Sequence, residues 1–356
     1  MQTKPQTVVF LVHTEYHLLV ALSVAADKYA NLRFHKVIIC LAGRIAEKKH
    51  LFNPNFQEES QIELLFVAYK EKAKSYDSGL HSFVKQLISL EISKFIIFNE
   101  HNFLPLYLAK KLSGHKVEIC LGPDGTKPYG TFNKLALGWR LRFAVNFLKF
   151  QLTNKLSLVG PHIPQLKYAS LKDLNKVWVQ FPDFFPASKT HAQVVGINVL
   201  QSKEAIEACS LFFSFNADEE IIVREKTIFY INQPLRNPGI YDFEIQLLTE
   251  LKQQFPGYKL SIKLHPFTDA AQIKRMKGVT NAIFYTKSYP AELYIAQLTD
   301  SVVISFWSAA CLSNNPNTRI YWVHPLLKHA GLMIDYISFL NPTRHIIEAQ
   351  GLNEIK

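Results

Sequence analysis

The residues best suited to chemistry lie in one short segment in the second half of the chain, Lys263-Leu264-His265-Pro266. The apolar run 258–262 before it predicts a strand, and 269–272 predicts the start of a helix. Ligands of α/β proteins bind at the carboxyl ends of parallel strands, and free N–H groups at a helix N-terminus attract anions. The segment is therefore suited to hold a phosphate. A strand-to-loop turn with a surface histidine is the alternative.

Two further loops in this half carry polar residues just after predicted strands. They contain Pro290 and Glu292, and Ser305 and Ser308. Because the carboxyl ends of parallel strands share one sheet edge, we expect both loops to lie beside His265. Hydroxyl and cationic groups bind phosphate oxygens, and a carboxylate commonly binds ribose hydroxyls. Together the three loops predict a nucleotide-sugar site.

The first half carries a candidate base in a loop dense in Gly and Pro, 122–130. Asp124 follows the predicted strand 117–121, and Gly125 would let a ligand approach the backbone closely. A plain Asp-Gly turn is the alternative. His17 and Asn99 also lie just past predicted strands, where a ligand cleft is expected.

Alternating strands and helices predict the fold. Thr14 is the expected N-cap of a helix after the strand 8–12. This rhythm continues through the first half and starts again at 227, which indicates two parallel sheets. A GxGxxG fingerprint is absent from the first half. Short apolar runs at 156–159 and 177–180 also predict strands.

We therefore predict an α/β protein with two Rossmann-like domains, a cleft between them and a helical C-terminal segment over 326–356. This layout resembles that of GT-B glycosyltransferases. The predicted boundaries are 1–190 for an acceptor-binding domain, 191–225 for the crossover, and 226–356 for a nucleotide-sugar-binding domain.

Composition limits the classes of protein. The chain has 356 residues and a net charge of +11, which suits an anionic partner. Four widely spaced cysteines without a CxxC pair indicate free thiols in a reducing compartment. A signal-peptide pattern and an apolar run of bilayer-spanning length are both absent from the sequence. We expect a cytoplasmic protein, soluble or peripheral on the inner membrane.

The segment Lys134–Lys155 mixes basic and aromatic residues and contains no acidic residue. This composition is typical of a helix lying on a membrane surface. A long core helix with a solvated basic side is the alternative. Nucleic acid is not an expected partner, because no nucleic-acid-binding motif accompanies the segment.

Taken together, the motifs resemble those of bacterial GT-B sialyltransferases and polysialyltransferases. The resemblance rests on Asp124-Gly125, on the His265-Pro266 pair and on the serines 305 and 308. Thr14 to Leu19, Gln233 to Leu235 and Pro290 to Glu292 are similar too. Two positions depart from the family pattern: Pro123 stands where an acidic residue is frequent, and the serine pair is split by two residues.

The resemblance implies a reaction. The donor would be a CMP-activated acidic sugar, most simply CMP-sialic acid, used as a co-substrate without cofactor or metal. Asp124 would act as general base on an acceptor hydroxyl, and His265 would assist departure of CMP. Attack would be direct and inverting. The acceptor would be a glycan or glycolipid of surface polysaccharide or lipooligosaccharide synthesis, with 134–155 touching the inner membrane.

The resemblance also implies a set of binding residues. Ser305 and Ser308 would hold phosphate oxygens. Because the serine pair is split, the resemblance leaves open which of the two serines contacts phosphate. Glu292 would bind the ribose of cytidine, and Lys263 would offset negative charge. The full set of expected substrate-binding residues is Lys263, Pro266, Glu292, Ser305, Ser308, Gly125, Gln233, Thr14, His17 and Asn99.

Three alternatives stay open at this point. A Kdo transferase would use CMP-Kdo, and a CDP-glycerol glycerophosphotransferase would also release CMP. A glycan-binding or membrane-binding module without catalytic activity is the third.

Overall fold

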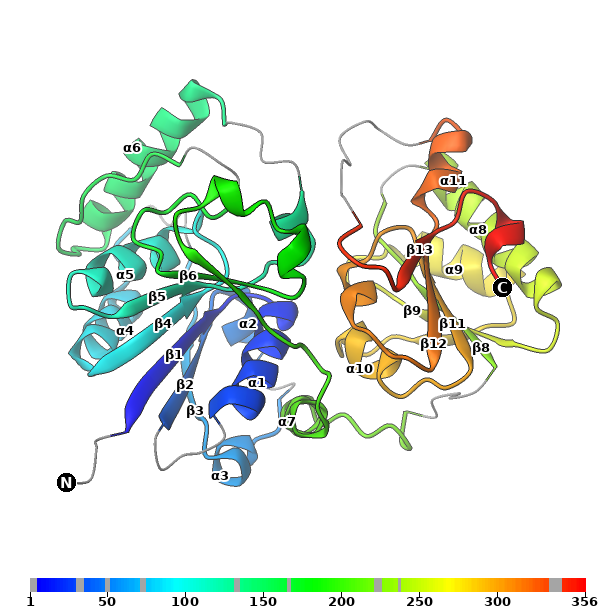
Figure 1. Ribbon diagram of the computed structural model, residues 1–356, viewed down its shortest axis with the longest axis horizontal. Coiled ribbons are helices and arrows are strands. Elements are labelled where there is room, and N and C mark those ends of the chain that lie inside the picture. Colours follow the sequence, from blue (N-terminus) through cyan, green and yellow to red (C-terminus); the bar gives the residue numbers. More distant parts are fainter. Residues whose placement is uncertain are drawn as a thin grey trace. The chain divides into compact units, whose positions relative to one another are not determined.

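The computed structural model describes residues 5–29, 35–48, 52–70, 75–130, 135–164, 168–220, 226–235, 238–332 and 341–356. The chain divides into two compact units, the first ending at Ser214 and the second starting at Phe215. Each unit has one parallel sheet with helices on both faces (Figure 1). This is the predicted architecture of two Rossmann-like domains.

The first sheet has seven described strands in the order β3-β2-β1-β4-β5-β6-β7, all parallel. Their bounds are β1 Gln6–Val12, β2 His35–Ala42, β3 Glu63–Val67, β4 Ile92–Ile97, β5 Glu118–Leu121, β6 Lys176–Val179 and β7 Gln193–Gly196. The central strands are almost entirely buried, because helices cover both faces of the sheet. Their continuous apolar runs follow from that burial.

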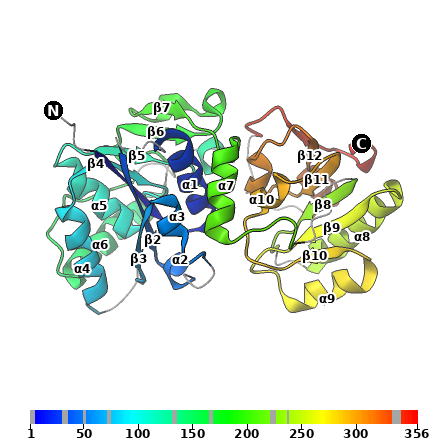
Figure 2. The same cartoon turned by 90° about the horizontal axis from the view of Figure 1, so that it is seen from below.

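Helices of the first unit lie on the two faces of this sheet. Figures 1 and 2 show α1 and α7 on one face and α4, α5 and α6 on the other. The helical segments are α1 Glu15–Tyr29, α2 Arg44–Glu47, α3 Phe56–Ser60, α4 Ser78–Ser89, α5 Phe103–Ser113, η2 Lys127–Tyr129, α6 Leu137–Thr153, η3 Pro182–Phe184, η4 Ala187–Lys189 and α7 Lys203–Phe213. As predicted, Thr14 caps α1: its Oγ1 accepts the N–H of His17 at 3.2 Å.

The second sheet has six described strands in the order β10-β9-β8-β11-β12-β13, again all parallel. They are β8 Thr227–Ile231, β9 Lys259–Lys263, β10 Ile283–Tyr285, β11 Ser301–Ser305, β12 Thr318–Trp322 and β13 Ile346–Glu348. The helical segments are α8 Pro238–Gln254, α9 Ala270–Val279, α10 Ala291–Ile295, η5 Ala309–Leu312, α11 His324–His329 and η6 Leu352–Glu354. Leu247, Leu251 and Met276 of α8 and α9 pack on one face of the sheet. On the other face, Tyr294 of α10 stacks on Phe229.

Two sequence predictions are wrong. The expected C-terminal helix over 326–356 is replaced by the short α11 and by β13, which pairs with β12; 333–340 lie outside the described residues. The expected strand at 156–159 is an irregular segment that runs back along α6. There the N–H of Val159 donates to Gln151 Oε1 at 2.7 Å.

The boundary between the units falls within the expected crossover, 191–225. Most of that stretch belongs to the first unit, because β7 pairs with β6 and α7 packs against α1. Residues 221–225 lie outside the described part of the chain. None of the described helices combines the length and the hydropathy that a membrane span requires.

Candidate active site

Each sheet has a point at which the order of its strands reverses, and such points favour ligand binding. In the first sheet the strand order reverses between β1 and β4, and in the second it reverses between β8 and β11. Loops that leave neighbouring strands on opposite faces open a crevice at their carboxyl ends. The residues predicted from sequence lie at these two edges, and each edge is described separately below.

At the edge of the first sheet, Asp124 is paired with His17. His17 Nε2 lies 3.1 Å from Asp124 Oδ1, although 106 residues separate the two in the chain. The backbone N–H of His13 donates to His17 Nδ1 at 3.4 Å, so Nε2 of the neutral ring carries the proton and donates it to Asp124. The His17 ring is buried and stacks on Phe98, with ring centroids 4.8 Å apart.

The surroundings of Asp124 keep its carboxylate charged. Burial alone would raise its pKa. The hydrogen bond from His17 and the ion pair to Lys127 together outweigh burial and lower the pKa of Asp124 from 3.8 to about 2. The side chain stays 19 % exposed, so a substrate hydroxyl can reach it. The arrangement is that of an oriented proton acceptor.

The loop that carries Asp124 is held rigidly. A Cβ on Gly122 would lie 2.5 Å from the Phe98 ring, so only glycine fits beneath the ring that also stacks on His17. Gly125 has φ of +60°, a left-handed conformation that glycine adopts without strain. Tyr168 donates its hydroxyl to the carbonyl of Gly122 at 2.7 Å. Sequence reasoning had not singled out Gly122, Phe98 or Tyr168.

Two other residues predicted for the first site act within their own loops. Thr14 caps α1, as described above. Asn99 Oδ1 accepts the N–H of His101 at 2.8 Å and so closes the turn after β4. Both fix the backbone at the edge where the Asp124–His17 pair lies.

At the edge of the second sheet, Gln233 joins the loops that follow β8 and β11. Its Oε1 accepts the N–H of Trp307 at 2.9 Å and lies 3.3 Å from Ser305 Oγ. Ser305 is fully buried and its hydroxyl also lies 3.1 Å from the carbonyl of Ile231. Ser308 is only partly buried, and its Oγ accepts the N–H of Ala310 at the start of η5. Ser305 therefore fixes the loop, while Ser308 lies nearer to solvent.

His265 lies in a tight turn that sets its tautomer. The N–H of Phe267 donates to His265 Nδ1 at 3.1 Å, so Nε2 carries the proton of the neutral ring. The N–H of Thr268 donates to the carbonyl of His265 at 3.0 Å. Pro266 lies exposed within the turn. In the neutral form the imidazole therefore carries its hydrogen-bond donor on Nε2.

A buried polar network holds this turn. Thr268 donates its hydroxyl to Asn232 Oδ1, and Asn232 Nδ2 donates to Glu244 Oε1 at 2.8 Å. Glu244, buried on α8, also accepts from Tyr230 at 2.6 Å and from Gln272. Burial raises the pKa of Glu244, and its three donors partly offset that rise. The network links α8, β8 and α9 to the loop that bears His265.

Lys263 and Glu292 are both buried next to this loop. Lys263 Nζ donates to the carbonyls of Leu264 and Lys287 at 3.2 and 2.9 Å. Burial lowers the pKa of Lys263 from 10.5 to about 8, partly offset by the charges of Glu292 and Glu220. Burial also raises the pKa of Glu292. Below pH 8, Lys263 therefore supplies a positive charge held in one place at the carboxyl end of β9.

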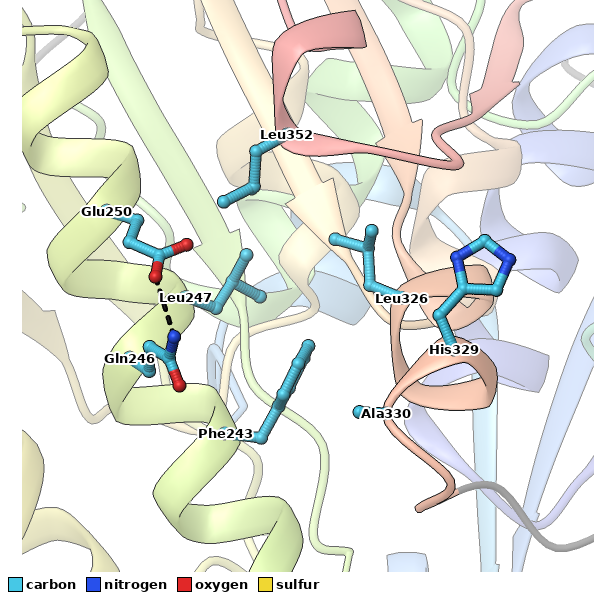
Figure 3. Close-up of a pocket in the computed structure, with 8 residues that line it drawn as sticks. All are labelled: Phe243, Gln246, Leu247, Glu250, Leu326, His329, Ala330 and Leu352. Carbon is cyan, nitrogen blue, oxygen red and sulfur yellow. Dashed lines mark hydrogen bonds between the residues drawn. The ribbon is translucent and has the colours of Figure 1, made fainter.

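A cavity of about 340 Å³ lies elsewhere in the second unit (Figure 3). Apolar side chains of α8 and α11 line it, with Gln246 and Glu250 bonded to each other at one side. None of the residues predicted for the site lines this cavity. Within the described ranges, no group of three or more His, Cys, Asp or Glu is placed to hold a metal ion, and the four cysteines are buried and form no disulfide.

Comparison with known proteins identifies the family. The model described as alpha-2,8-polysialyltransferase (POLYST) matches residues 6–317. No curated protein sequence matches the chain. A solved sialyltransferase from Photobacterium damsela is 11% identical with a TM-score of 0.52, over 98% of this chain and 82% of that chain.

Two other solved structures share the fold. The spinosyn forosaminyltransferase SpnP is 9% identical, over 94% of this chain and 87% of that chain, with a TM-score of 0.51. A putative UDP-N-acetylglucosamine 2-epimerase from Listeria monocytogenes is 8% identical, over 87% of this chain and 76% of that chain, with a TM-score of 0.52. At these identities the likenesses show the fold alone, the two-domain α/β fold of GT-B type.

The family match covers nearly the whole chain and confirms the resemblance seen in the sequence motifs. The protein is an enzyme, a glycosyltransferase of the sialyltransferase type. This chain belongs to the alpha-2,8-polysialyltransferase family.

Proposed function

We propose that the protein transfers sialic acid from CMP-sialic acid to a glycan hydroxyl, directly, with inversion and without a metal ion or cofactor. The observation that carries this proposal is the carboxylate of Asp124, kept charged and oriented by the N–H of His17 at the carboxyl edge of its sheet. In a polysialyltransferase family member, a fixed proton acceptor suits attack by an acceptor hydroxyl.

In the proposed step, the acceptor oxygen bonds to the anomeric carbon while the bond from that carbon to the CMP phosphate breaks. The hydroxyl proton passes to Asp124. With a pKa of about 2, Asp124 is a weak base. It takes the proton late, when bond formation has made the hydroxyl strongly acidic. His17 keeps its own proton and orients the carboxylate.

The leaving phosphate would be stabilised by residues at the edge of the second sheet. His265 would donate a hydrogen bond from Nε2 to a phosphate oxygen, and Lys263 would supply a positive charge in a poorly solvated place. Of the two serines we assign the phosphate contact to Ser308, because its side chain is partly exposed whereas Ser305 is fully buried and bonded within the loop. Glu292 would bind the ribose. Catalysis would rest on positioning and electrostatics.

The acceptor we propose is a glycan of surface polysaccharide or lipooligosaccharide, carried at the inner face of a membrane. The basic helix α6 would bring the enzyme to that surface as a peripheral protein in the cytoplasm. The net charge of +11 suits an anionic donor, an anionic glycan and an anionic lipid surface alike.

Donor competition tests the proposed function. Purified enzyme with an oligosialic acid acceptor is expected to release CMP from CMP-sialic acid, equally with and without EDTA. CMP-Kdo and CDP-glycerol should give no acceptor-dependent product. Product formed from CMP-Kdo alone would identify a Kdo transferase, and glycerophosphate transfer would identify a glycerophosphotransferase. Failure to release CMP from any of the three donors would refute the proposed donor class.

A further inference from the structure

The structure exposes a face of α6 that the sequence pattern did not single out. The aromatic side chains Phe143, Phe147 and Phe150 point inward and contact Phe103 of α5, with ring centroids 5.3 to 6.0 Å apart. They form the core face of the helix. An aliphatic stripe on the opposite side is left in contact with solvent.

This stripe consists of Leu137, Leu141, Val145, Leu148 and Leu152, which are 47 to 63 % exposed. At 3.6 residues per turn, their spacing places all five within an arc of about 80°. Such a row extends along almost the whole 17-residue helix. Scattered exposed leucines are ordinary on protein surfaces, but a continuous aliphatic stripe marks a contact surface.

The segment after α6 extends the apolar surface. It runs back beside the helix, since Val159 is bonded to Gln151 and the His162 ring contacts Phe143. Leu158 and Ile163 of this segment are 63 and 43 % exposed. The apolar surface is therefore formed by more than the helix alone.

Charge indicates what covers the stripe. Arg142 and Lys149 are exposed along one of its borders, and α6 contains no acidic residue. Residues 101–172 contain eleven Lys and Arg but only two Asp and Glu, so this stretch carries +9 of the net charge of +11. An aliphatic stripe bordered by cations complements a bilayer surface with anionic headgroups.

We propose that the α6 stripe lies on an anionic lipid bilayer, with the five aliphatic side chains among the acyl chains and Arg142 and Lys149 at the headgroups. This inference deepens the membrane contact of the proposed function, but lipid binding does not depend on which sugar is transferred. The two can therefore fail separately.

Vesicle flotation of the full-length protein tests the proposal. Wild-type protein is expected to float with vesicles of phosphatidylcholine and phosphatidylglycerol, less with phosphatidylcholine alone, and less at high salt. The double variant Leu141→Ser/Leu148→Ser should lose binding to both. Arg142→Gln/Lys149→Gln should weaken binding to anionic vesicles, by about fivefold per charge.

Controls separate the stripe from general hydrophobicity. Phe66→Ser alters an exposed aromatic residue of β3 and should bind vesicles as wild type does. The stripe variants should keep the wild-type thermal midpoint, because the replaced side chains are exposed. Absence of vesicle binding by wild type, or undiminished binding by the stripe variant, would overturn the proposal. So would a wild-type dimer in light scattering that the stripe variant abolishes, because a second copy would then cover the stripe.

Discussion

Replacing His17 should change the titration of Asp124. The pKa of Asp124 is about 2 instead of 3.8. At about 1.4 kcal/mol per tenfold change in proton affinity, this difference favours the carboxylate by ~2.5 kcal/mol. His17 is the larger of the two contributors that oppose burial, ahead of Lys127. In His17→Leu, which removes the donor, we expect the pKa of Asp124 to rise, because burial is then opposed by Lys127 alone.

The effect on stability has a definite sign. Since the pKa of Asp124 is lower in the folded state, its contribution is complete above the unfolded value of 3.8 and is lost as the pH falls toward about 2. The His17→Leu variant should therefore lose stability relative to wild type at neutral pH. The pH-dependent part of this gap should shrink on acidification. Urea unfolding at several pH values measures it.

Carbon-13 NMR of the Asp124 carboxyl gives the direct assay, together with the acid limb of the acceptor-dependent rate. His17→Gln, which keeps a side-chain N–H donor, should restore part of the low pKa and serves as the matched control. If the carboxyl in His17→Leu still titrates near 2, His17 does not hold Asp124, and the reasoning is refuted.

Three further predictions concern the second sheet. Donor binding should weaken as the pH rises through about 8, where Lys263 loses its proton, and Lys263→Met should remove that limb in donor titrations by fluorescence. Thr268→Val should release the turn of His265, lower kcat about tenfold and cost ~1 kcal/mol of stability. The control Thr249→Val, on the exposed face of α8, should change neither kcat nor stability. An unchanged kcat in Thr268→Val would contradict the role of this network. Ser308→Ala should raise the KM for donor without affecting stability. Ser305→Ala should lower the free energy of unfolding in urea by about 1–2 kcal/mol. The reverse pattern would assign phosphate binding to Ser305.

The fold was largely predictable from the sequence, because buried parallel strands appear as continuous apolar runs. β1 is such a run, and the position of Asp124 just after β5 follows from the same pattern. Elements that depend on distant partners were not predictable. β13 has three residues and exists only because β12 offers it an edge. The apolar run 156–159 packs beside α6 without forming a strand, because Gln151 binds its backbone.

The residues of the candidate site were more predictable from the sequence than the contacts between them. Asp124 and His17 were both expected near ligand, yet their contact depends on β1, β4 and β5 being neighbours in the sheet. Gly122 could have indicated close packing at the site, because a glycine at the end of a buried strand often lies against another group. Here that group is the Phe98 ring. On α6, basic and aromatic composition predicted a contact helix, but the burial of the aromatic face depends on distant partners such as Phe103 of α5 and His162.

The central claim is that Asp124 accepts the proton of the acceptor hydroxyl. The most direct measurement compares acceptor-dependent CMP release from CMP-sialic acid by wild type, Asp124→Asn and the exposed control Asp183→Asn. The account predicts that Asp124→Asn lowers this rate by about 10²–10⁴ with unchanged affinity for CMP, while Asp183→Asn behaves as wild type. A rate for Asp124→Asn equal to that of wild type would contradict the claim.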